Sequence, residues 1–236
     1  MKTVIVIPTY NERNNIEALI PEVLQLMPHI HIMVVDDNSP DGTADVVRRI
    51  AASNKQVSLL WREKKEGLGK AYLHAFEELS QDVGIEHIVM MDADFSHHPS
   101  YLPAILKAAE TSDMVIGSRY VGGGSGTEGW ELWRRVLSRL ASFYCRAVTR
   151  MPLTDFTAGY MLIRTTMLDS NFTKSIDLSG YAFLIELKYA LWKKGARMSE
   201  VPIVFKRRRE GESKLSSHII REGIIAPWKM IFRKRV

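Results

Sequence analysis

The chain has 236 residues, of which 46% are hydrophobic and 25% charged, with a formal net charge of +5. This composition is ordinary for a soluble globular protein, and the length suits one large α/β domain or two small ones. The single cysteine, Cys145, excludes an internal disulfide and is consistent with a reducing compartment. No stretch reaches 18 consecutive apolar residues, so the sequence predicts no transmembrane helix. The opening run is interrupted by Pro8, and it reads as a first strand rather than a secretory signal.

Apolar β-branched runs alternate with longer helical stretches through the first half of the chain. The predicted strands cover 3–8, 30–35, 57–61, 85–91 and 114–118, and the predicted helices lie near 14–27, 42–53, 69–80 and 99–110. This alternation predicts βαβ units in a mostly parallel sheet with right-handed crossovers.

The pattern changes at the glycine-rich segment VGGGSGTEG (121–129), which predicts a loop. This segment is the one plausible domain boundary, but the elements after it are too few to form a core alone. Those elements are helices near 130–149 and 180–194, strands over 160–165 and 198–205, and a last helix near 216–233 that Pro227 interrupts. We therefore expect a single catalytic domain over residues 1–215, followed by a basic amphipathic segment over 216–236.

Positive charge is concentrated near the C-terminal end. Residues 200–236 hold ten Lys or Arg against four Glu, which leaves a net charge of −1 for residues 1–199. A basic segment indicates either a phosphate-bearing or anionic membrane partner, or a solvated tail. Alternating phosphate contacts and base-stacking aromatics are not evident, so we expect no nucleic-acid partner.

Two carboxylates, Asp92 and Asp94, follow the predicted strand 85–91. Residues two apart on an extended chain point to the same side, and ligands bind beyond the carboxyl ends of parallel strands. The two charges repel unless a cation lies between them, and hard oxygen ligands suit Mg²⁺ or Mn²⁺ shared with substrate phosphates. The alternative is a capping Asp94 and a solvated Asp92. No Cys/His cluster at zinc spacing accompanies His97 and His98, so they are predicted to be surface or turn residues.

A second acidic cluster, VVDDNSPDGT (34–43), follows the predicted strand 30–35. Asp37 is a candidate for contact with a base or ribose. Asp41 or Thr43 is a candidate cap for the following helix, within a segment of turn-forming residues.

The motifs occur in an ordered set: IVIPTYNE (5–12), VVDDNSPDGT (34–43), REKKEGLGKAY (62–72), MDADFSHHP (91–99), GSRYVGGG (117–124), TDFTAGYMLIR (154–164), GYAFLIEL (180–187) and FKRRREGESKL (205–215). In this set the chain resembles the dolichol-phosphate (polyprenol-phosphate) mannose synthases of glycosyltransferase family 2, from about residue 3 to residue 215. The resemblance implies a GT-A fold, that is, a Rossmann-like nucleotide-binding sheet flanked by helices. It also implies Mg²⁺- or Mn²⁺-dependent transfer of mannose from GDP-mannose to dolichyl or polyprenyl phosphate, with inversion at the anomeric carbon.

The resemblance also assigns roles to individual residues. It implies nucleotide-sugar binding by Pro8, Tyr10, Glu12, Asp37, Asp92 and Lys214, metal binding by Asp92, Asp94 and Ser96, acceptor-phosphate binding by Arg119, Arg134 and Ser138, and catalytic roles for Asp94, Arg119 and Arg208. Ser96 stands where many relatives have a glutamine as third metal ligand, and its shorter side chain leaves room for a water. Many relatives also continue into transmembrane helices beyond the point where this chain ends.

The implied chemistry needs no general base, because a lipid phosphate is already anionic near neutral pH. Arg119 and Arg134 suit it because a guanidinium binds phosphate through two parallel hydrogen bonds. Arg134 and Ser138 are four residues apart and share a helix face. We find no Ser/His/Asp triad, and we expect direct displacement without a covalent enzyme intermediate.

Two other functions fit the same residues: a polyprenyl-phosphate glucosyltransferase that uses UDP-glucose, and a non-catalytic nucleotide-sugar-binding module. A lipid acceptor implies a peripheral protein on the cytosolic face of a membrane. The tail 218–236 predicts either an interfacial amphipathic segment or a helix packed on the catalytic domain. A separate membrane-anchoring subunit is a third possibility.

Overall fold

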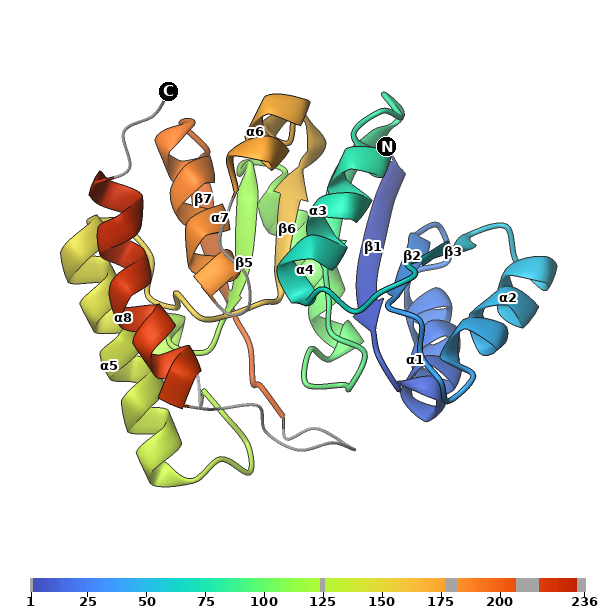
Figure 1. Ribbon diagram of the computed structural model, residues 1–236, viewed down its shortest axis with the longest axis horizontal. Coiled ribbons are helices and arrows are strands. Elements are labelled where there is room, and N and C mark those ends of the chain that lie inside the picture. The colour runs from blue at the N-terminus through green and yellow to red at the C-terminus, as the bar shows by residue number, and fades with distance from the viewer. Residues whose placement is uncertain (1, 124–125, 177–181, 207–216, 233–236) are drawn as a thin grey trace.

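The computed structural model describes residues 2–123, 126–176, 182–206 and 217–232 (Figure 1). Its seven strands form one sheet in the order β3-β2-β1-β4-β6-β5-β7. The strands are β1 (Lys2–Thr9), β2 (His31–Asp36), β3 (Val57–Trp61), β4 (Ile85–Met90), β5 (Met114–Ser118), β6 (Met161–Arg164) and β7 (Met198–Pro202). Only β6 runs antiparallel to its neighbours, β4 and β5. The predicted mostly parallel α/β sheet is therefore confirmed.

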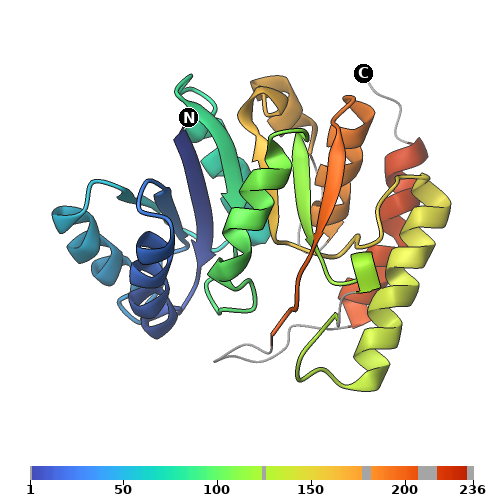
Figure 2. The ribbon, with the colours of Figure 1, turned by 180° about the vertical axis from the view of Figure 1, so that it is seen from behind.

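Helices cover both faces of the sheet. They are α1 (Arg13–Leu26), α2 (Thr43–Ser53), α3 (Leu68–Leu79), α4 (Leu102–Ala109), α5 (Leu132–Thr149), α6 (Ser170–Ser175), α7 (Ala182–Lys193) and α8 (Ser217–Phe232). Short 3₁₀ turns lie at Pro99–Tyr101, Val121–Gly123 and Thr165–Met167. Helices α3 and α7 lie over the face seen in Figure 1, and α1 and α4 lie over the face seen in Figure 2. Helices α5 and α8 lie side by side at the β7 end of the sheet.

The central strands are apolar on both sides because each face of the sheet packs on helices. In β1, Val4 and Val6 pack with α3 and α7, whereas Ile5 and Ile7 pack with α1 and α2 on the opposite face. Burying one such side chain stabilises the fold by about 1.5–3 kcal/mol before the cost of ordering it. The continuous apolar runs in the sequence therefore reflect burial on two faces.

The glycine-rich segment after β5 is not a boundary between domains. Strand β7, which comes late in the chain, pairs in parallel with β5, and Ser118 lies opposite Pro202. Gly117 in β5 lies against Ile203, since a Cβ on this glycine would come within 3.1 Å of the isoleucine side chain. The elements after residue 129 thus complete the sheet that the earlier elements begin.

Three expectations about secondary structure need correction. Helix α8 continues through Pro227, which was expected to interrupt it. A proline inside a helix costs about 3 kcal/mol, and the burial of Ala226 and Met230 in the core compensates here. The predicted strand 198–205 ends at Pro202. Helix α6, which the sequence did not predict, begins after Asp169, whose carboxylate accepts a hydrogen bond from the Phe172 amide at 2.8 Å.

Within the described residues, none of the helices combines the length and the apolar character needed to cross a bilayer.

Cys145 provides a test of the packing between α5 and the core. It is 1% exposed, and burial raises the pKa of its thiol to about 11. Because the thiolate is the reactive form, we expect no reaction with a soluble disulfide reagent at pH 8 in the native protein, and one thiol per chain after unfolding in urea. A fast stoichiometric reaction of the native protein would contradict this packing.

Candidate active site

The loops that follow β1 and β2 meet at the carboxyl edge of the sheet, at the bottom of Figure 1. Thr9, which ends β1, donates its hydroxyl to Asp36 at 2.9 Å, and the Ser39 hydroxyl donates to the same carboxylate at 2.6 Å. Asn11 and Asn38 both have left-handed backbone conformations, with φ of 60° and 56°. Asp36 is fully buried, and its hydrogen bonds hold these two loops together.

Asp37, the neighbouring carboxylate, is held by an arginine that the sequence analysis did not single out. The Arg62 guanidinium donates one hydrogen bond to Asp37 and another to Glu66, from two different nitrogens and both at 2.8 Å. Burial raises the pKa of Asp37, and the Arg62 guanidinium opposes that rise. Arg62 belongs to the REKKEGLGKAY motif, but only the folded chain shows that it reaches back to the end of β2.

The PTYNE segment (8–12) covers the end of β1 and the loop that follows it. The Lys65 ammonium lies 3.4 Å from the centre of the Tyr10 ring, as in a cation–π contact. The Glu12 carboxylate accepts a hydrogen bond from Asn15 at 2.7 Å. Pro8 lies within β1, opposite Val35 of β2. These three predicted nucleotide-sugar residues, with Asp37, line up along adjacent strand ends.

Asp41 links the beginnings of two helices. Its carboxylate accepts hydrogen bonds from the Arg13 amide at 3.1 Å and from the Thr43 hydroxyl at 2.6 Å. Since Arg13 begins α1 and Thr43 begins α2, Asp41 supports both helix N-termini. This role agrees with the helix-capping interpretation.

Asp92 and Asp94 follow β4 directly and differ in exposure. The Asp92 side chain is 32% exposed, whereas Asp94 is 6% exposed. Asp94 accepts hydrogen bonds from both the amide and the hydroxyl of Ser96, at 3.0 and 2.5 Å. Phe95, which lies between Asp94 and Ser96, is buried and has a φ of 61°. A bulky residue in this conformation is strained, which indicates that the turn is held tightly by its surroundings.

His97 is buried within the turn that follows β4, so of its two predicted places, surface or turn, only the surface is wrong. It is 2% exposed and stacks on Tyr160 with ring centroids 4.9 Å apart. Its Nδ1 accepts a hydrogen bond from the Asp92 amide at 3.0 Å. His97 therefore supports the turn that presents Asp92. His98, by contrast, is half-buried and caps the 3₁₀ turn that follows, by accepting from the Ser100 amide at 3.2 Å.

The oxygen donors of Asp92 and Asp94 fit a hard divalent cation. In the described part of the chain, no group of three or more His, Cys, Asp or Glu residues could enclose a metal. Mg²⁺ and Mn²⁺ are suited to such a site because they commonly take one or two carboxylates and complete their coordination with water and substrate phosphates.

Arg119 forms a buried ion pair with Asp155. The guanidinium donates to the two Asp155 oxygens at 2.7 Å each, and the Arg119 amide donates to the same carboxylate at 3.0 Å. Asp155 is fully buried and Arg119 is 4% exposed. Burial alone would raise the pKa of Asp155, but the charge and hydrogen bonds of Arg119 hold it below its ordinary value. Asp155 was present in the TDFTAGY motif but carried no predicted role.

The antiparallel direction of β6 explains this pairing. Because β6 runs against β5, its beginning lies at the carboxyl ends of β4 and β5. The loop before β6 therefore reaches the end of β5, where Arg119 follows. The Gly117 amide donates to the Tyr160 carbonyl at 2.8 Å and fixes the relative position of the two segments.

The other predicted acceptor residues lie on α5 near this pair. The Ser138 hydroxyl lies 3.4 Å from that of Thr157, which in turn accepts a hydrogen bond from Arg119 at 2.5 Å. Arg134 lies one turn before Ser138, with its Nε 3.2 Å from a Glu131 oxygen. The structure therefore links Arg119 to Ser138 through Thr157, while Arg134 forms an ion pair with Glu131, the residue just before α5.

Two further charged residues support the loop before β6. The Lys188 ammonium, fully buried on α7, donates to the carbonyls of Phe156 and Ala158 at 2.8 and 2.6 Å. Burial lowers the pKa of Lys188 to about 8, although the Asp155 charge opposes that fall. Glu200 of β7 accepts from the Thr154 and Asp155 amides at 2.8 and 3.0 Å. With Arg119 and Asp155, these residues form a set with two positive and two negative charges.

Aromatic rings surround the Arg119 guanidinium. It lies 5.2 to 5.7 Å from the ring centres of Tyr120, Trp130 and Phe205. Phe205 also contacts His97, with ring centroids 5.6 Å apart. Phe205 therefore lies between two parts of the site. We call the part around Asp37, Asp92 and Asp94 the acidic half and the part around Arg119 and Arg134 the arginine half. The predicted phosphate-binding residues Arg208 and Lys214, which follow Phe205 in the chain, lie outside the described residues.

Comparisons with known proteins agree with this architecture. The model of the family "Glycosyl transferase family 2" matches residues 4–172. The chain is 39% identical to an undecaprenyl-phosphate mannosyltransferase of Micrococcus luteus, over 95% of this chain and 92% of that protein. It is 40% identical to a polyprenol monophosphomannose synthase of Mycolicibacterium smegmatis, over 96% of this chain and 86% of that protein.

Solved structures show the same fold at lower identity. Glucosyl-3-phosphoglycerate synthase from Mycobacterium tuberculosis, in complex with Mn²⁺, UDP and phosphoglyceric acid, matches with a TM-score of 0.67 and 18% identity, over 97% of this chain and 77% of that one. The same enzyme with Mg²⁺ and UDP matches with a TM-score of 0.64 and 19% identity, over 97% and 78% of the two chains. The ordered motifs, the seven-stranded sheet and the two near-full-length relatives together show that this chain belongs to glycosyl transferase family 2, among the polyprenol-phosphate mannose synthases.

Proposed function

We propose that the protein transfers mannose from GDP-mannose to a dolichyl or polyprenyl phosphate, with inversion at the anomeric carbon, to give polyprenyl phosphate mannose and GDP. The observation that carries this proposal is the identity of 39 and 40% to two mannosyl-transferring relatives, over at least 95% of the chain. The arrangement of the site supports it, because an acidic half and an arginine half face the same edge of the sheet.

The acidic half is assigned to the donor. Asp37 would contact the guanosine, with its orientation held by Arg62, while Pro8, Tyr10 and Glu12 line the adjacent strand end. Asp92, Asp94 and Ser96 would hold Mg²⁺ or Mn²⁺ between them and the diphosphate. The bound ion would supply charge stabilisation for the departing GDP. In this structure the Ser96 hydroxyl donates to Asp94, so its contribution includes fixing the orientation of that carboxylate.

The arginine half is assigned to the acceptor. The acceptor phosphate would approach Arg119, Arg134 and Ser138, and Asp155 would hold the Arg119 guanidinium in one orientation. Such preorganisation matters because a charged group that is already oriented costs no rearrangement during reaction. The phosphate oxygen is itself the nucleophile, so direct displacement needs no protein base. Arg208 and Lys214 are proposed to contact the diphosphate, as the resemblance implies.

Helices α5 and α8 offer a surface for the membrane that carries the acceptor. Of the fourteen large apolar side chains exposed in the described part of the chain, ten lie on these two helices: Leu132, Trp133, Val136, Leu140, Phe143, Ile224, Ile225, Trp228, Ile231 and Phe232. Apolar helix faces flanked by basic residues favour the bilayer interface. The Trp228 indole donates to the Tyr144 hydroxyl at 2.7 Å, which joins the two helices. We propose a peripheral protein on a cytosolic membrane face, with helix α8 packed on the catalytic domain and also facing lipid.

The proposal is tested by sugar transfer. Purified protein, labelled GDP-mannose, Mg²⁺ or Mn²⁺ and a short polyprenyl phosphate are incubated, and label in the organic phase is counted. We expect transfer from GDP-mannose that is lost with EDTA and restored by excess metal. Transfer from UDP-glucose but not from GDP-mannose would support the mechanism but overturn the assignment of the donor. Retention of configuration in the product, or a trapped mannosyl-enzyme adduct, would contradict direct displacement.

Asp37→Asn tests the assignment of the donor base. The substitution keeps the size of the side chain but removes the charge that faces Arg62 and the proposed guanosine. We expect KM for GDP-mannose to rise about tenfold, corresponding to one lost charged hydrogen bond of about 1.5 kcal/mol, while kcat changes little. The control is Asp45→Asn on the exposed surface of α2. A tenfold fall in kcat with KM unchanged would argue against a contact between Asp37 and the base.

A further inference from the structure

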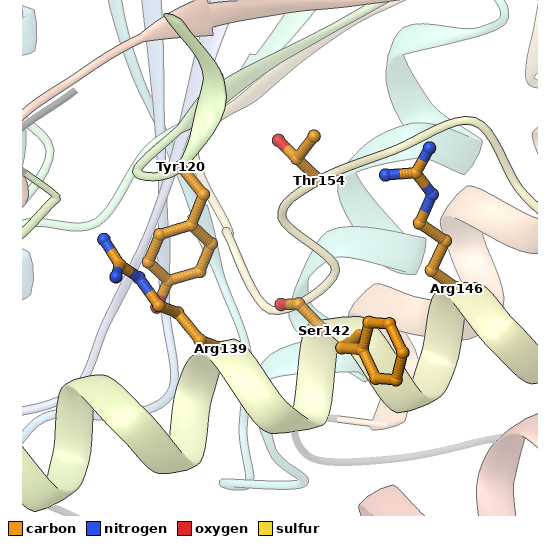
Figure 3. Close-up of a pocket in the computed structure, with 6 residues that line it drawn as sticks. Tyr120, Arg139, Ser142, Arg146 and Thr154 are labelled. Atoms are coloured by element: carbon orange, nitrogen blue, oxygen red, sulfur yellow. The ribbon is translucent and has the colours of Figure 1, made fainter. Parts of the chain in front are cut away.

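A pocket beside α5 lies outside the residues assigned to donor and acceptor. It has a volume of about 190 Å³ and is lined by Tyr120, Arg139, Ser142, Phe143, Arg146 and Thr154. Figure 3 shows Arg139, Ser142 and Arg146 rising from one helix, with Tyr120 and Thr154 on the segments that face it. Residues 139, 142 and 146 are spaced by three and four, so they share one face of α5.

The lining carries two positive charges and no carboxylate. Among the described residues, neither Arg139 nor Arg146 forms an ion pair, whereas Arg119 and Arg134 are paired with Asp155 and Glu131. The Arg139 guanidinium lies 5.4 Å from the centre of the Tyr120 ring. The residues that line the pocket therefore carry a net positive charge, and Glu200 accepts hydrogen bonds from the amide and hydroxyl of the lining residue Thr154, both at 2.8 Å.

Polar groups in the lining have hydrogen-bonding capacity to spare. The Tyr120 hydroxyl is buried and has no hydrogen-bond partner among the described residues. A buried hydroxyl left without a partner is costly, which favours a ligand or water at that place. The Ser142 hydroxyl accepts from the Phe156 amide at 3.3 Å and keeps its own proton to donate. Donors of this kind suit an anion with several oxygens.

The pocket borders the apolar surface of α5. Leu140, which follows Arg139, is 58% exposed, and Phe143, which itself lines the pocket, is 72% exposed. At 100° per residue, the exposed apolar side chains and the Arg139–Arg146 row lie on adjacent strips of the helix. If the apolar strip enters the bilayer interface, the two guanidiniums come to the depth of the lipid headgroups.

We propose that this pocket is a second anion site, separate from Arg119, Arg134 and Ser138, which binds the phosphate of an anionic phospholipid and orients the enzyme on the bilayer. The proposal rests on the membrane approach proposed above. A guanidinium binds phosphate and carboxylate alike through two parallel hydrogen bonds. A phosphate headgroup has more oxygens than a carboxylate, so it can also accept from the Tyr120 and Ser142 hydroxyls, and the site would prefer it to a carboxylate of equal charge.

The test is co-sedimentation of the full chain with vesicles, which measures binding without sugar transfer. Vesicles of phosphatidylcholine contain either phosphatidylglycerol or, at equal surface charge, oleate. The variants are Arg139→Gln with Arg146→Gln, Tyr120→Phe, and the charge-matched control Arg48→Gln with Arg49→Gln on α2, at the far end of the molecule from α5 (Figure 1). Sugar transfer in detergent with a short acceptor serves as a separate check of the active site.

We expect the Arg139/Arg146 pair of substitutions to weaken binding to oleate vesicles about 30-fold, at roughly fivefold per arginine near any anionic surface. Binding to phosphatidylglycerol vesicles should fall clearly more, because the directed hydrogen bonds to the phosphate are lost as well, and Tyr120→Phe should weaken only the phosphatidylglycerol binding. Transfer in detergent should be unchanged in the arginine variant, and the α2 control should bind as wild type.

If binding to both kinds of vesicle fell equally and Tyr120→Phe had no effect, the two arginines would act only by general charge attraction, and the proposal would be overturned. Inorganic phosphate is a further arm, added at constant ionic strength. Displacement from phosphatidylglycerol vesicles by low phosphate concentrations would identify a site for free phosphate and overturn the lipid assignment. If the wild-type protein showed no sugar transfer but bound vesicles as expected, the proposed function alone would be refuted.

Discussion

Asp94→Asn is expected to lower the rate of mannosyl transfer by a hundredfold or more, on the order of the effect of losing one preorganised charge-stabilising group. The substitution keeps the shape of the side chain and leaves an oxygen that can still accept from the Ser96 amide, as Asp94 does at 3.0 Å. It removes one of the two negative charges proposed to hold the metal against the diphosphate. The fold should therefore persist while metal binding and transfer fail together.

Mn²⁺ binding, measured by the loss of the free-ion electron paramagnetic resonance signal, separates this cause from a change in structure. We expect weaker Mn²⁺ binding in Asp94→Asn and wild-type binding in Asp45→Asn, whose carboxylate lies on exposed α2. Protection of Cys145 from a disulfide reagent reports whether the core is intact, because that thiol is 1% exposed. Full transfer activity with Mn²⁺ binding abolished would remove Asp94 from the mechanism.

Asp155→Asn is expected to lower the free energy of unfolding by about 3–5 kcal/mol, because it leaves Arg119 buried without its compensating charge. The pair combines a fully buried aspartate with an arginine that is 4% exposed. Asp169→Asn is the matched control, since its ion pair with Lys194 involves side chains that are 54% and 32% exposed. Exposed pairs contribute about 0–1 kcal/mol, and asparagine can still cap α6. Urea unfolding at pH 7 measures both differences.

A paired replacement distinguishes structural from catalytic roles. Changing Arg119→Met together with Asp155→Asn removes both charges, while the asparagine oxygen can still accept from the Thr157 and Ala158 amides, as Asp155 does at 3.2 and 3.1 Å. We expect stability to recover toward wild type while transfer stays lost, because the acceptor phosphate then has no guanidinium at the end of β5. Recovery of both stability and transfer would show that the pair is structural only.

The pH dependence of this pair has a definite sign. The folded pKa of Asp155 is held below its ordinary value of 3.8, so the folded state favours the charged carboxylate. The stabilisation is fully present well above pH 3.8 and is lost as the pH falls through the depressed folded pKa. Wild type should therefore lose stability in acid more steeply than Asp155→Asn, and parallel acid profiles of the two proteins would contradict the pairing.

Sequence patterns predicted the parts of this protein that depend on local regularity. The alternation of apolar runs and helical stretches predicted a mostly parallel sheet, because strands buried on both faces need apolar residues at every position. Carboxylates after the strands ending at Asp36 and Met90 predicted an acidic edge, since parallel strands end on the same side. The ordered motifs predicted the family. Each of these signals lies within a short stretch of chain.

Only the tertiary structure revealed the partners of those residues. Arg119 meets Asp155 because β6 enters the sheet antiparallel, and Lys188 meets the same loop from α7. His97 is buried because Tyr160 and Phe205 pack on it, and α8 continues through Pro227 because its neighbours in the core offset the lost hydrogen bond. The sequence by itself determined most of the elements and the family, and it predicted an acidic edge of the sheet. The tertiary structure decided which buried charges compensate one another, because that depends on contacts between residues tens of positions apart and on the desolvation they share.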